Sequence, residues 1–402
     1  MAEIARTPAL TAGSPMRSWL APLLLYCLGH FVVDVYQGAL GVLQPALMDR
    51  FGLSFTQVGV LGGAFVCSSS MAQPLYGYLC DRFRSRLFSA LGPVVAALFV
   101  CTVGWAGGFG WLLLMIILSG VGVAAYHPQA ASNAVAGIRR NRARAMAVFI
   151  GCGSLGWAFG PVFFSFMLNH GGLDRLLWGT IPGVLATLLL LGVLPPTVQK
   201  GTSQEKFDWA VLAAIWKPMT ILFVLVMIRS VVQVTFGQFL PLYLHTQRHH
   251  TLAEASIYLS LYLACGAIGG FAGGNLADRF GGRIIILVSM LGSVPFLLLF
   301  VFGRGVWSLA GLLLGGLILL FTMPVNIVMA QELAPSQAGT VSALMMGLAW
   351  GSAGFIFIPL TGWISDVLSM QWAFTGLVLI PLFGFLLGLK LPRDLDCSLG
   401  RH

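Results

Sequence analysis

The chain contains two nearly identical stretches, Gly77-Tyr-Leu-Cys-Asp81-Arg82-Phe-Arg84-Ser-Arg86 and Gly274-Asn-Leu-Ala-Asp278-Arg279-Phe-Gly281-Gly-Arg283. Each stretch lies between two long apolar runs, and the second follows the first by about half of the 402-residue chain. Prolines inside the apolar runs recur with nearly the same separation, in the pairs Pro45 and Pro241, Pro128 and Pro324, and Pro161 and Pro359. A constant separation across several markers indicates two parallel repeats, an arrangement typical of transporters that rock two halves about a central site.

The composition of the chain indicates a membrane protein. Hydrophobic residues make up 58% of the chain and charged residues only 9%, whereas a soluble domain carries about 25% charged residues. Such a chain cannot cover itself with a water-compatible surface. Apolar runs of about 20 residues are long enough to cross the hydrocarbon core as helices. We therefore expect an all-α polytopic membrane protein.

Twelve apolar segments predict twelve transmembrane helices, arranged as two pseudo-twofold six-helix bundles. The segments are 19–46, 54–80, 87–106, 110–134, 143–168, 176–195, 218–245, 254–277, 284–302, 306–330, 338–363 and 371–391. One long polar interruption lies at the midpoint and predicts a linker between the bundles. The expected divisions are a tail at 1–18, a first bundle at 19–195, a linker at 196–217, a second bundle at 218–391 and a tail at 392–402.

The basic residues predict how the chain is oriented in the membrane. The formal net charge is +9, and most of the 22 lysines and arginines fall in alternate loops, together with both tails and the linker. By the positive-inside rule, both ends of the chain are expected in the cytoplasm. The charge excess therefore indicates contact with anionic lipid and not a nucleic-acid partner. The seven cysteines lie mostly inside apolar runs and lack the spacing of a disulfide framework or a zinc site.

Polar side chains within the apolar runs are the candidate site residues, because an ionised group at the bilayer centre costs about 2.5–3.5 kcal/mol on insertion scales. The first run carries His30, Asp34 and Gln37, whose spacing places them on one face of a helix. The fourth, seventh and tenth runs carry His127 and Gln129, Arg229 and Gln233, and Asn326. Two neighbouring aromatic residues, Tyr36 and Tyr126, are candidate contacts with a substrate, although core packing explains them equally well.

Asp34 is the carboxylate that lies well inside an apolar run. Burial disfavours the charged form of a carboxylate, and an imidazole beside it titrates near neutral pH. Asp34 with His30 or His127 is therefore a candidate proton-coupling site. The alternative is a permanent polar cluster whose hydrogen bonds hold the first and fourth helices together.

Arg229 carries a planar guanidinium that suits a carboxylate or a phosphate. The repeat places Arg229 within one residue of the position equivalent to Asp34, so the two side chains could face each other across a cavity. One interpretation is an anchor for an anionic substrate group. The other is a permanent ion pair with Asp34 that locks the two halves together, and both can hold in different states.

The repeated turn resembles the signature of the major facilitator superfamily, which lies between helices two and three and again between helices eight and nine. The second copy is the fuller match, whereas the first has Arg84 where glycine is usual. This resemblance covers about residues 19–391 and implies that the first, fourth, seventh and tenth helices line a central cavity. It also implies a gating role for the charged residues of the turns, Asp81, Arg82, Arg86, Asp278, Arg279 and Arg283.

The fifth helix contains Gly156-Trp-Ala-Phe-Gly160-Pro161, which looks like an element of drug–proton antiporters in that superfamily. Small residues allow helices to approach closely, and Pro161 removes a backbone hydrogen bond. Gly156, Gly160 and Pro161 are therefore added to the candidate gating residues.

Three further stretches resemble the fosmidomycin-resistance group of this superfamily. They are His30-x-x-x-Asp34-x-x-Gln37, Tyr126-His127-Pro128-Gln129-Ala130 and Ala330-Gln331-Glu332-Leu333-x-Pro335. The resemblance implies proton-driven efflux of small antibiotics, including a phosphonate anion, across the inner membrane by alternating access. We expect a monomer that takes a small-molecule substrate and protons, lies among membrane lipids and uses no cofactor or metal.

Other functions remain open. A proton-coupled metabolite importer is the nearest, although the glycine–proline element of the fifth helix favours export. An intramembrane enzyme could use His127 and Asp34 as acid–base groups, but the chain lacks a nucleophile–base spacing or a metal set to accompany them. A non-transporting sensor is a further alternative, but it would be expected to carry a sizeable signalling domain, and the short predicted tails provide none. The loop residues His245, His249 and His250 could bind a metal, but only Glu254 lies near them as a carboxylate.

Overall fold

A computed structural model of the chain describes residues 20–83, 85–136, 138, 142–194, 213 and 215–391. The described part is helical, as expected for a segment that must satisfy its backbone hydrogen bonds internally in lipid. Both predicted tails, most of the predicted linker, Arg84 and the side chain of Asp81 lie outside the described residues.

The described helices fall into two groups on either side of the predicted linker. The first half contains α1 (Leu20–Gln37), α2 (Ala39–Phe51), α3 (Phe55–Val66), η1 (Cys67–Met71), α4 (Gln73–Phe83), α5 (Leu87–Cys101), η2 (Val103–Trp105), α6 (Phe109–Ala134), α7 (Arg142–Gly171), η3 (Leu173–Thr180) and α8 (Ile181–Val193). The second half contains α10 (Trp216–Arg248), α11 (Leu252–Phe280), α12 (Gly282–Phe302), α13 (Gly305–Leu319), α14 (Thr322–Leu333), η4 (Pro335–Gln337), α15 (Ala338–Ala343), η5 (Leu344–Ala349), α16 (Trp350–Val367) and α17 (Met370–Gly388).

The apolar segments predicted from the sequence are helical in the structure. Within the described residues, eleven helical stretches are long and apolar enough to cross a membrane. The remaining predicted segment, 87–106, contains the 15-residue helix α5, which stops at Cys101 before a short 3₁₀ turn. At 1.5 Å per residue α5 measures about 22 Å, less than the ~30 Å of a hydrocarbon core.

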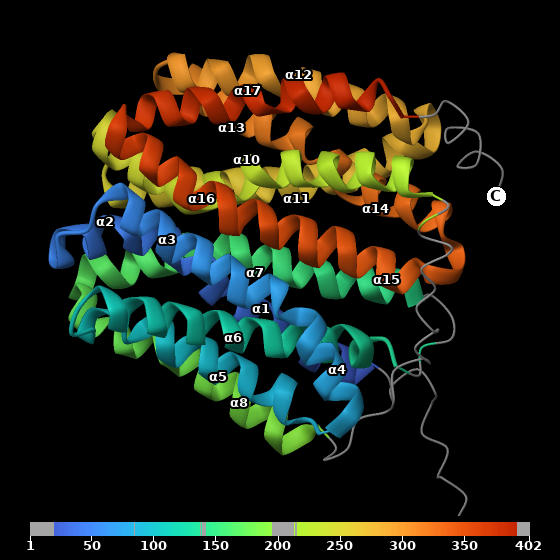
Figure 1. Cartoon of the computed structure of the whole chain (residues 1–402). Helices are drawn as coiled ribbons and strands as arrows, with labels where there is room; N and C mark the ends of the chain where they lie inside the picture. The colour runs from blue at the N-terminus through green and yellow to red at the C-terminus, as the bar shows by residue number, and fades with distance from the viewer. Residues whose placement is uncertain are drawn as a thin grey trace, which may run out of the picture.

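The two halves repeat the same packing. In the first half α5 packs against α6, and in the second half α12 packs against α13 in the same way. Between the halves, α3 packs along α16 and α7 packs along α11, so each half contributes one member to each of two seams. Figure 1 shows the helices running side by side along the length of the molecule, with α16 crossing toward α3 and α7.

Helix capping follows the duplication as well. Ser54 and Gln57 form a capping box at the start of α3, and Thr251 and Glu254 form another at the start of α11. A capping box satisfies two free backbone N–H groups and fixes where a helix begins. The two boxes are separated by the same distance along the chain as the repeated arginine turns, so the duplicated register extends to the helix ends.

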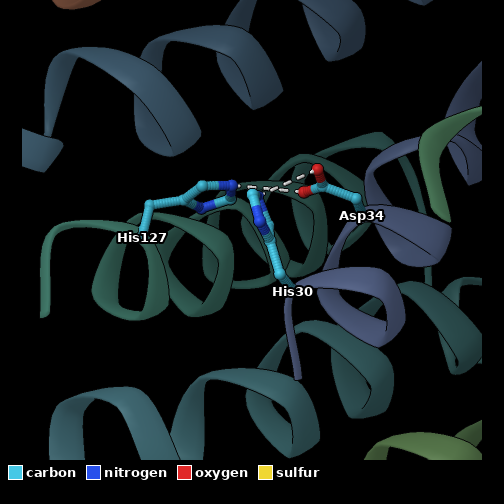
Figure 2. Close-up of side chains that lie close together, drawn as sticks. All are labelled: His30, Asp34 and His127. Carbon is cyan, nitrogen blue, oxygen red and sulfur yellow. Dashed lines mark ion pairs between the residues drawn. The ribbon is translucent and has the colours of Figure 1, made fainter. Parts of the chain in front are cut away.

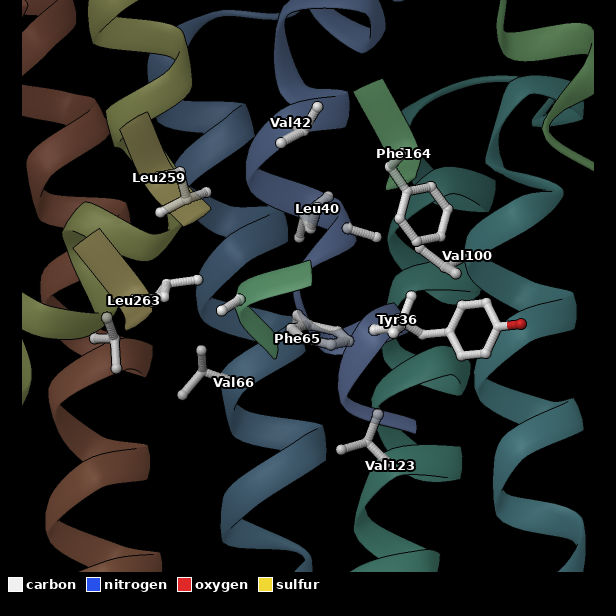
Figure 3. Close-up of a cluster of buried hydrophobic side chains, with 14 of the residues drawn as sticks. Tyr36, Leu40, Val42, Phe65, Val66, Val100, Val123, Phe164, Leu259 and Leu263 are labelled. Atoms are coloured by element: carbon white, nitrogen blue, oxygen red, sulfur yellow. The ribbon is translucent and has the colours of Figure 1, made fainter. Parts of the chain in front are cut away.

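The helices connect at two opposite ends of the molecule. The linker end is where α8 finishes at Val193 and α10 begins at Trp216, and the far end is where α2 finishes at Phe51 and α3 begins at Phe55. Apolar packing continues across the halves. The buried cluster in Figure 3 combines Tyr36, Leu40 and Phe65 of the first half with Leu259 and Leu263 of α11.

Two π-helices interrupt the helices of one seam. The π-helix η1 follows α3, and the π-helix η5 precedes α16. The two π-helices contact each other across the seam. Each π turn contains an extra residue in a helix that is otherwise α-helical, and such turns are frequent at functional sites.

Candidate functional site

Three titratable side chains meet inside the first half. His30 and Asp34 come from α1 and His127 comes from α6 (Figure 2). His30 Nε2 lies 3.3 Å from Asp34 Oδ2, and His127 Nε2 lies 3.2 Å from Asp34 Oδ1. His30 and Asp34 are buried and His127 is partly buried. The i, i+4 spacing on one helix face explains the first contact, and the packing of α1 against α6 supplies the second.

Backbone carbonyls fix the tautomer of both imidazoles. His30 Nδ1 lies 2.8 Å from the carbonyl oxygen of Phe149, and His127 Nδ1 lies 2.8 Å from the carbonyl oxygen of Val123. Because a carbonyl oxygen only accepts hydrogen bonds, each Nδ1 carries the proton and donates it. Neutral imidazoles in this arrangement turn two Nε2 lone pairs toward the same carboxylate. A proton placed between either Nε2 and Asp34 would form a hydrogen bond there.

Gly153 of α7 makes room for this cluster. A Cβ built on Gly153 would lie 2.6 Å from Asp34 Oδ2 and would also collide with His30 Nε2. Only a residue without a side chain fits here, so α7 closes over the cluster without displacing it. Nothing in the sequence pattern distinguishes this glycine from the other 49.

The donor set of this cluster also bears on metal binding. Two imidazole nitrogens and one carboxylate oxygen lie within 4.8 Å of one another, close enough to share one ion. Zinc sites commonly use this kind of ligand. Any test of proton binding at these residues therefore needs a chelator in the buffer.

Arg229 of α10 is buried, with 3% of its surface exposed. Its Nη1 donates to Gln233 Oε1, and its guanidinium carbon lies 5.3 Å from the centre of the Trp350 ring. Within the described part of the chain no carboxylate pairs with Arg229, and its Nε has no hydrogen-bond partner. The ion pair with Asp34, the alternative interpretation of Arg229, is not formed in this conformation.

Trp350 lies at the boundary between the halves. The Trp350 ring of α16 and the Trp157 ring of α7 are 6.0 Å apart between centroids, at 61° to each other. A small cavity of about 20 Å³ is lined by these rings together with Gln37, Gln238 and other residues of both halves. Sequence reasoning missed both tryptophans, because in a chain with 11 of them an indole inside an apolar run gives no distinguishing signal.

A larger cavity, of about 490 Å³, lies elsewhere. It is lined by α5, α6 and the turn before α5, and its lining residues, such as Phe88, Leu91 and Val121, are almost entirely apolar. It touches none of the candidate polar residues. The smaller cavity is the candidate site, because ligand pockets carry a small number of placed polar groups.

Four predicted substrate contacts are buried away from the Trp157–Trp350 cavity. Tyr36 donates to the carbonyl of Gly179, 2.9 Å away, and accepts from the amide of Gly183. Gln129 bonds Ser85 and Ser89, and Tyr126 donates to the carbonyl of Tyr26. Asn326 of α14 is fully buried, with no hydrogen-bond partner for its amide group among the described residues. Of the predicted contacts, Gln37 lines that cavity and Gln233 holds Arg229.

Three candidate gating residues of the turns donate hydrogen bonds to residues of their own half. Arg82 donates to Tyr78, Arg86 donates to the carbonyl of Leu194, and Arg283 donates to the carbonyl of Leu389. Asp278 and Arg279 are exposed at the end of α11.

The glycines of the fifth transmembrane segment hold α7 against α1. A Cβ on Gly156 would collide with the carbonyl of Phe31, and one on Gly160 would collide with the carbonyl of Val35. Pro161, in the same helix, lies close to Gly38 at the break between α1 and α2. The close approach expected of these small residues is present, and it places Trp157 next to that break.

An acidic residue missed in the sequence closes the far end. Asp366 of α16 accepts hydrogen bonds from the backbone amides of Phe55 and Thr56, at 3.0 and 2.8 Å, and from the Thr56 hydroxyl. A carboxylate at a helix N-terminus is favoured by the unpaired N–H groups there. Asp366 therefore ties the second half to the first at this end.

Comparison with known proteins agrees with this architecture. The profile of the Major Facilitator Superfamily matches residues 26–358. An uncharacterized MFS-type transporter of Bacillus subtilis, YfnC, is 29% identical over 338 residues, covering 82% of this chain and 83% of the relative. The fosmidomycin resistance protein of Escherichia coli K12 is 27% identical over 354 residues, covering 86% of each.

A solved structure shares the fold. The bacterial homolog of the human lysosomal transporter Spinster, in an inward-facing and occupied conformation, superposes with a TM-score of 0.81 at 16% identity, over 97% of this chain and all of the other. The profile match covers most of both halves. The chain belongs to the major facilitator superfamily of multi-pass membrane transporters.

Proposed function

We propose that the protein is a proton-coupled antiporter that exports a small anionic or amphipathic compound across the inner membrane. In this proposal α5 is the twelfth span, and the linker and both chain ends lie in the cytoplasm. The proposed exporter works as a monomer, needs no cofactor, and moves its substrate by alternating access. The resemblance to a fosmidomycin resistance protein supports export of a phosphonate-like anion.

One observation carries the proposal: the two halves hold opposite chemistry at the centre. The first half holds Asp34 between two Nε2 lone pairs, and the second half holds a buried Arg229 without a carboxylate partner. A proton between Asp34 and each histidine makes both close approaches favourable, and loss of the protons leaves negative charge facing lone pairs. Arg229, bonded only to neutral groups, keeps its charge available for an anion.

Asp366 ties α16 to α3 at the far end, and Arg82 and Arg86 of the first turn donate to partners in their own half, which suits a state open to the linker side. In the opposite state the turns would brace the linker ends of the halves against each other. Proton uptake at the cluster and anion binding at Arg229 would then occur in alternation, since each step changes the charge buried at the centre.

The test is transport by the purified protein in proteoliposomes, with a chelator present and a pH gradient imposed. Asp34→Asn should abolish coupling to the gradient, because an amide cannot release a proton. Asp49→Asn, which changes an exposed carboxylate at the end of α2, should leave coupling unchanged. Unchanged coupling in Asp34→Asn would refute the proton assignment.

Direction of flux separates the exporter from its nearest rival. An antiporter moves substrate in the direction opposite to proton flow, so substrate accumulates on the side with the higher proton concentration. A symporter moves substrate together with protons, so substrate accumulates on the side with the lower proton concentration. Arg229→Gln should weaken anion binding at least tenfold, since a buried charge-assisted hydrogen bond is lost. Arg175→Gln, at an exposed position, is the control.

A further inference from the structure

We propose that Trp157 and Trp350 make the site selective for planar aromatic anions, with the acidic group on Arg229 and the ring against the two indoles. This inference rests on the proposed function, because it assigns a substrate class to the same site. Neither tryptophan is among the candidate site residues predicted from the sequence.

The guanidinium of Arg229 is held by neutral groups on two sides. Gln233 accepts a hydrogen bond from Nη1, and the face of Trp350 lies 5.3 Å from the guanidinium carbon. The buried Nε–H has no hydrogen-bond partner among the described residues. A guanidinium bound this way keeps its positive charge and a free donor. An incoming acid therefore meets a preformed cation beside an aromatic face.

Two indoles from different halves meet, and one of them, Trp350, lies against this cation. The 61° angle and the 6.0 Å separation place Trp157 edge-on to Trp350, an arrangement that aromatic pairs favour. Trp350 is the first residue after the π-helix Leu344–Ala349, whose extra residue sets the direction in which the indole leaves α16. Trp157 is placed by the packing of α7 on α1 and lies 3.6 Å from a Cβ built on Gly237 of α10.

The cavity between these rings is polar at its edges. Gln37, Ser69 and Ser70 line it from the first half, and Gln238 lines it from the second. Its volume of about 20 Å³ holds little more than one water molecule, so a ring enters only when the halves part. Stacked aromatic pairs have centroids about 4.5–7 Å apart. An aromatic solute would replace the present Trp157–Trp350 contact with one ring contact to each half.

The lining and the neighbouring Arg229 together disfavour other solutes. Arg229, which lies against Trp350, repels cations, and the amide and hydroxyl groups of the lining bind ring substituents or heteroatoms without adding charge. An aliphatic acid would satisfy Arg229 but would leave both indole faces without a stacking partner. The expected preference is therefore for a ring over a saturated group of the same size and charge.

The experiment compares phenylphosphonate with cyclohexylphosphonate, which share the acidic group and differ in aromaticity. Each compound competes for transport by the full chain in proteoliposomes, and the inhibition constants are measured. The wild-type protein should favour phenylphosphonate by at least about fivefold, from two aromatic contacts. Trp350→Leu and Trp157→Leu should each reduce this ratio toward one, and Trp350→Phe should retain it.

Two variants separate this inference from the proposed function. Trp363→Leu, at a lipid-exposed indole on the same helix that is 53% exposed, should keep the wild-type ratio. Arg229→Gln should weaken both compounds equally. Suppose that Arg229→Gln weakens binding of both phosphonates. If the wild-type protein then shows no preference for phenylphosphonate, or if both tryptophan-to-leucine variants retain that preference, the aromatic inference is wrong and the anion site stands. If neither compound competes, both proposals fail.

Discussion

Gly153 shows how one missing side chain controls the chemistry of its neighbours. The residue sits on α7 against His30 and Asp34, and its backbone approaches them more closely than any Cβ would permit. The cluster is thus enclosed by three helices, α1, α6 and α7, although its side chains come from only two. Its geometry depends on a residue that takes no part in proton binding itself.

Substitution of Gly153 by alanine should therefore uncouple transport. The added methyl group would displace His30 or Asp34 and lengthen their 3.3 Å approach. We expect proton-driven transport to fall at least tenfold while substrate binding at Arg229 is retained within about twofold, an effect of strain in a packed core. Gly151→Ala is the matched control, because a Cβ there meets nothing within 4 Å. Equal coupling in the two variants would contradict this role.

The sequence predicted contacts correctly where the residues are spaced to share one face of a helix. His30 and Asp34 are four residues apart and share a face, and the structure brings them together. Tyr36 is two residues after Asp34, and Gln129 two after His127, which rotates each by about 200° around its helix. Both side chains were predicted to contact substrate, but each instead forms hydrogen bonds within the first half. Trp157, Trp350 and Asp366 carried no signal, because their importance comes from contacts between helices distant in sequence.

Among the elements, α3 and α16 form the seam that closes the far end. The seam has tight glycine contacts, since a Cβ on Gly362 would collide with the carbonyl of Phe55 and one on Gly59 would lie 2.8 Å from the carbonyl of Ile358. Asp366 adds three hydrogen bonds at its end. Close packing of glycines is apolar and weakly directional. The hydrogen bonds of Asp366 are directional, so they are lost as soon as the two helices separate at this end.

Asp366→Ala should shift the population toward conformations open at the far end. Three hydrogen bonds are lost, but the carboxylate is exposed and solvent compensates in part, so we expect about 1 kcal/mol, or about fivefold. The measurement is the rate of maleimide labelling of Val58→Cys, a buried position on α3, in a chain without other cysteines. Asp174→Ala removes an exposed ion pair with Arg50 inside the first half and should leave that rate unchanged.

For the whole molecule, the duplication visible in the sequence accounts for most of the architecture. Repeated turns, prolines and capping boxes share one register, and the two halves pack their helices in the same way. The length of α5 and the breaks at Gly38 and after Leu319 were not predictable from apolar runs, because hydrophobicity continues through them. The sequence also carried no information on which state the halves adopt.

Joining the halves across their centre should stop transport. A Cβ on Gly347 would lie 3.9 Å from the carbonyl oxygen of Ser70, so the two residues face each other across the contact between the π-helices, and we expect Ser70→Cys and Gly347→Cys to form a disulfide on oxidation. Oxidation should nearly abolish transport, and a reductant should restore it. The control is Gly179→Cys, paired with the native Cys101 inside the first half, where a Cβ would lie 3.0 Å from the sulfur. Continued transport after verified cross-linking would exclude rocking at this seam.

The π-helices have a consequence for how faces are assigned along these two segments. An α-helix turns by about 100° per residue, and a π turn adds one residue without adding a turn. A helical wheel drawn through 54–80 or 338–363 therefore misplaces every residue beyond Met71 or Ala349 by about 100°. Mutational scans of these segments will show two separate periodic patterns, one on each side of the extra residue, and a single fitted phase will average both away.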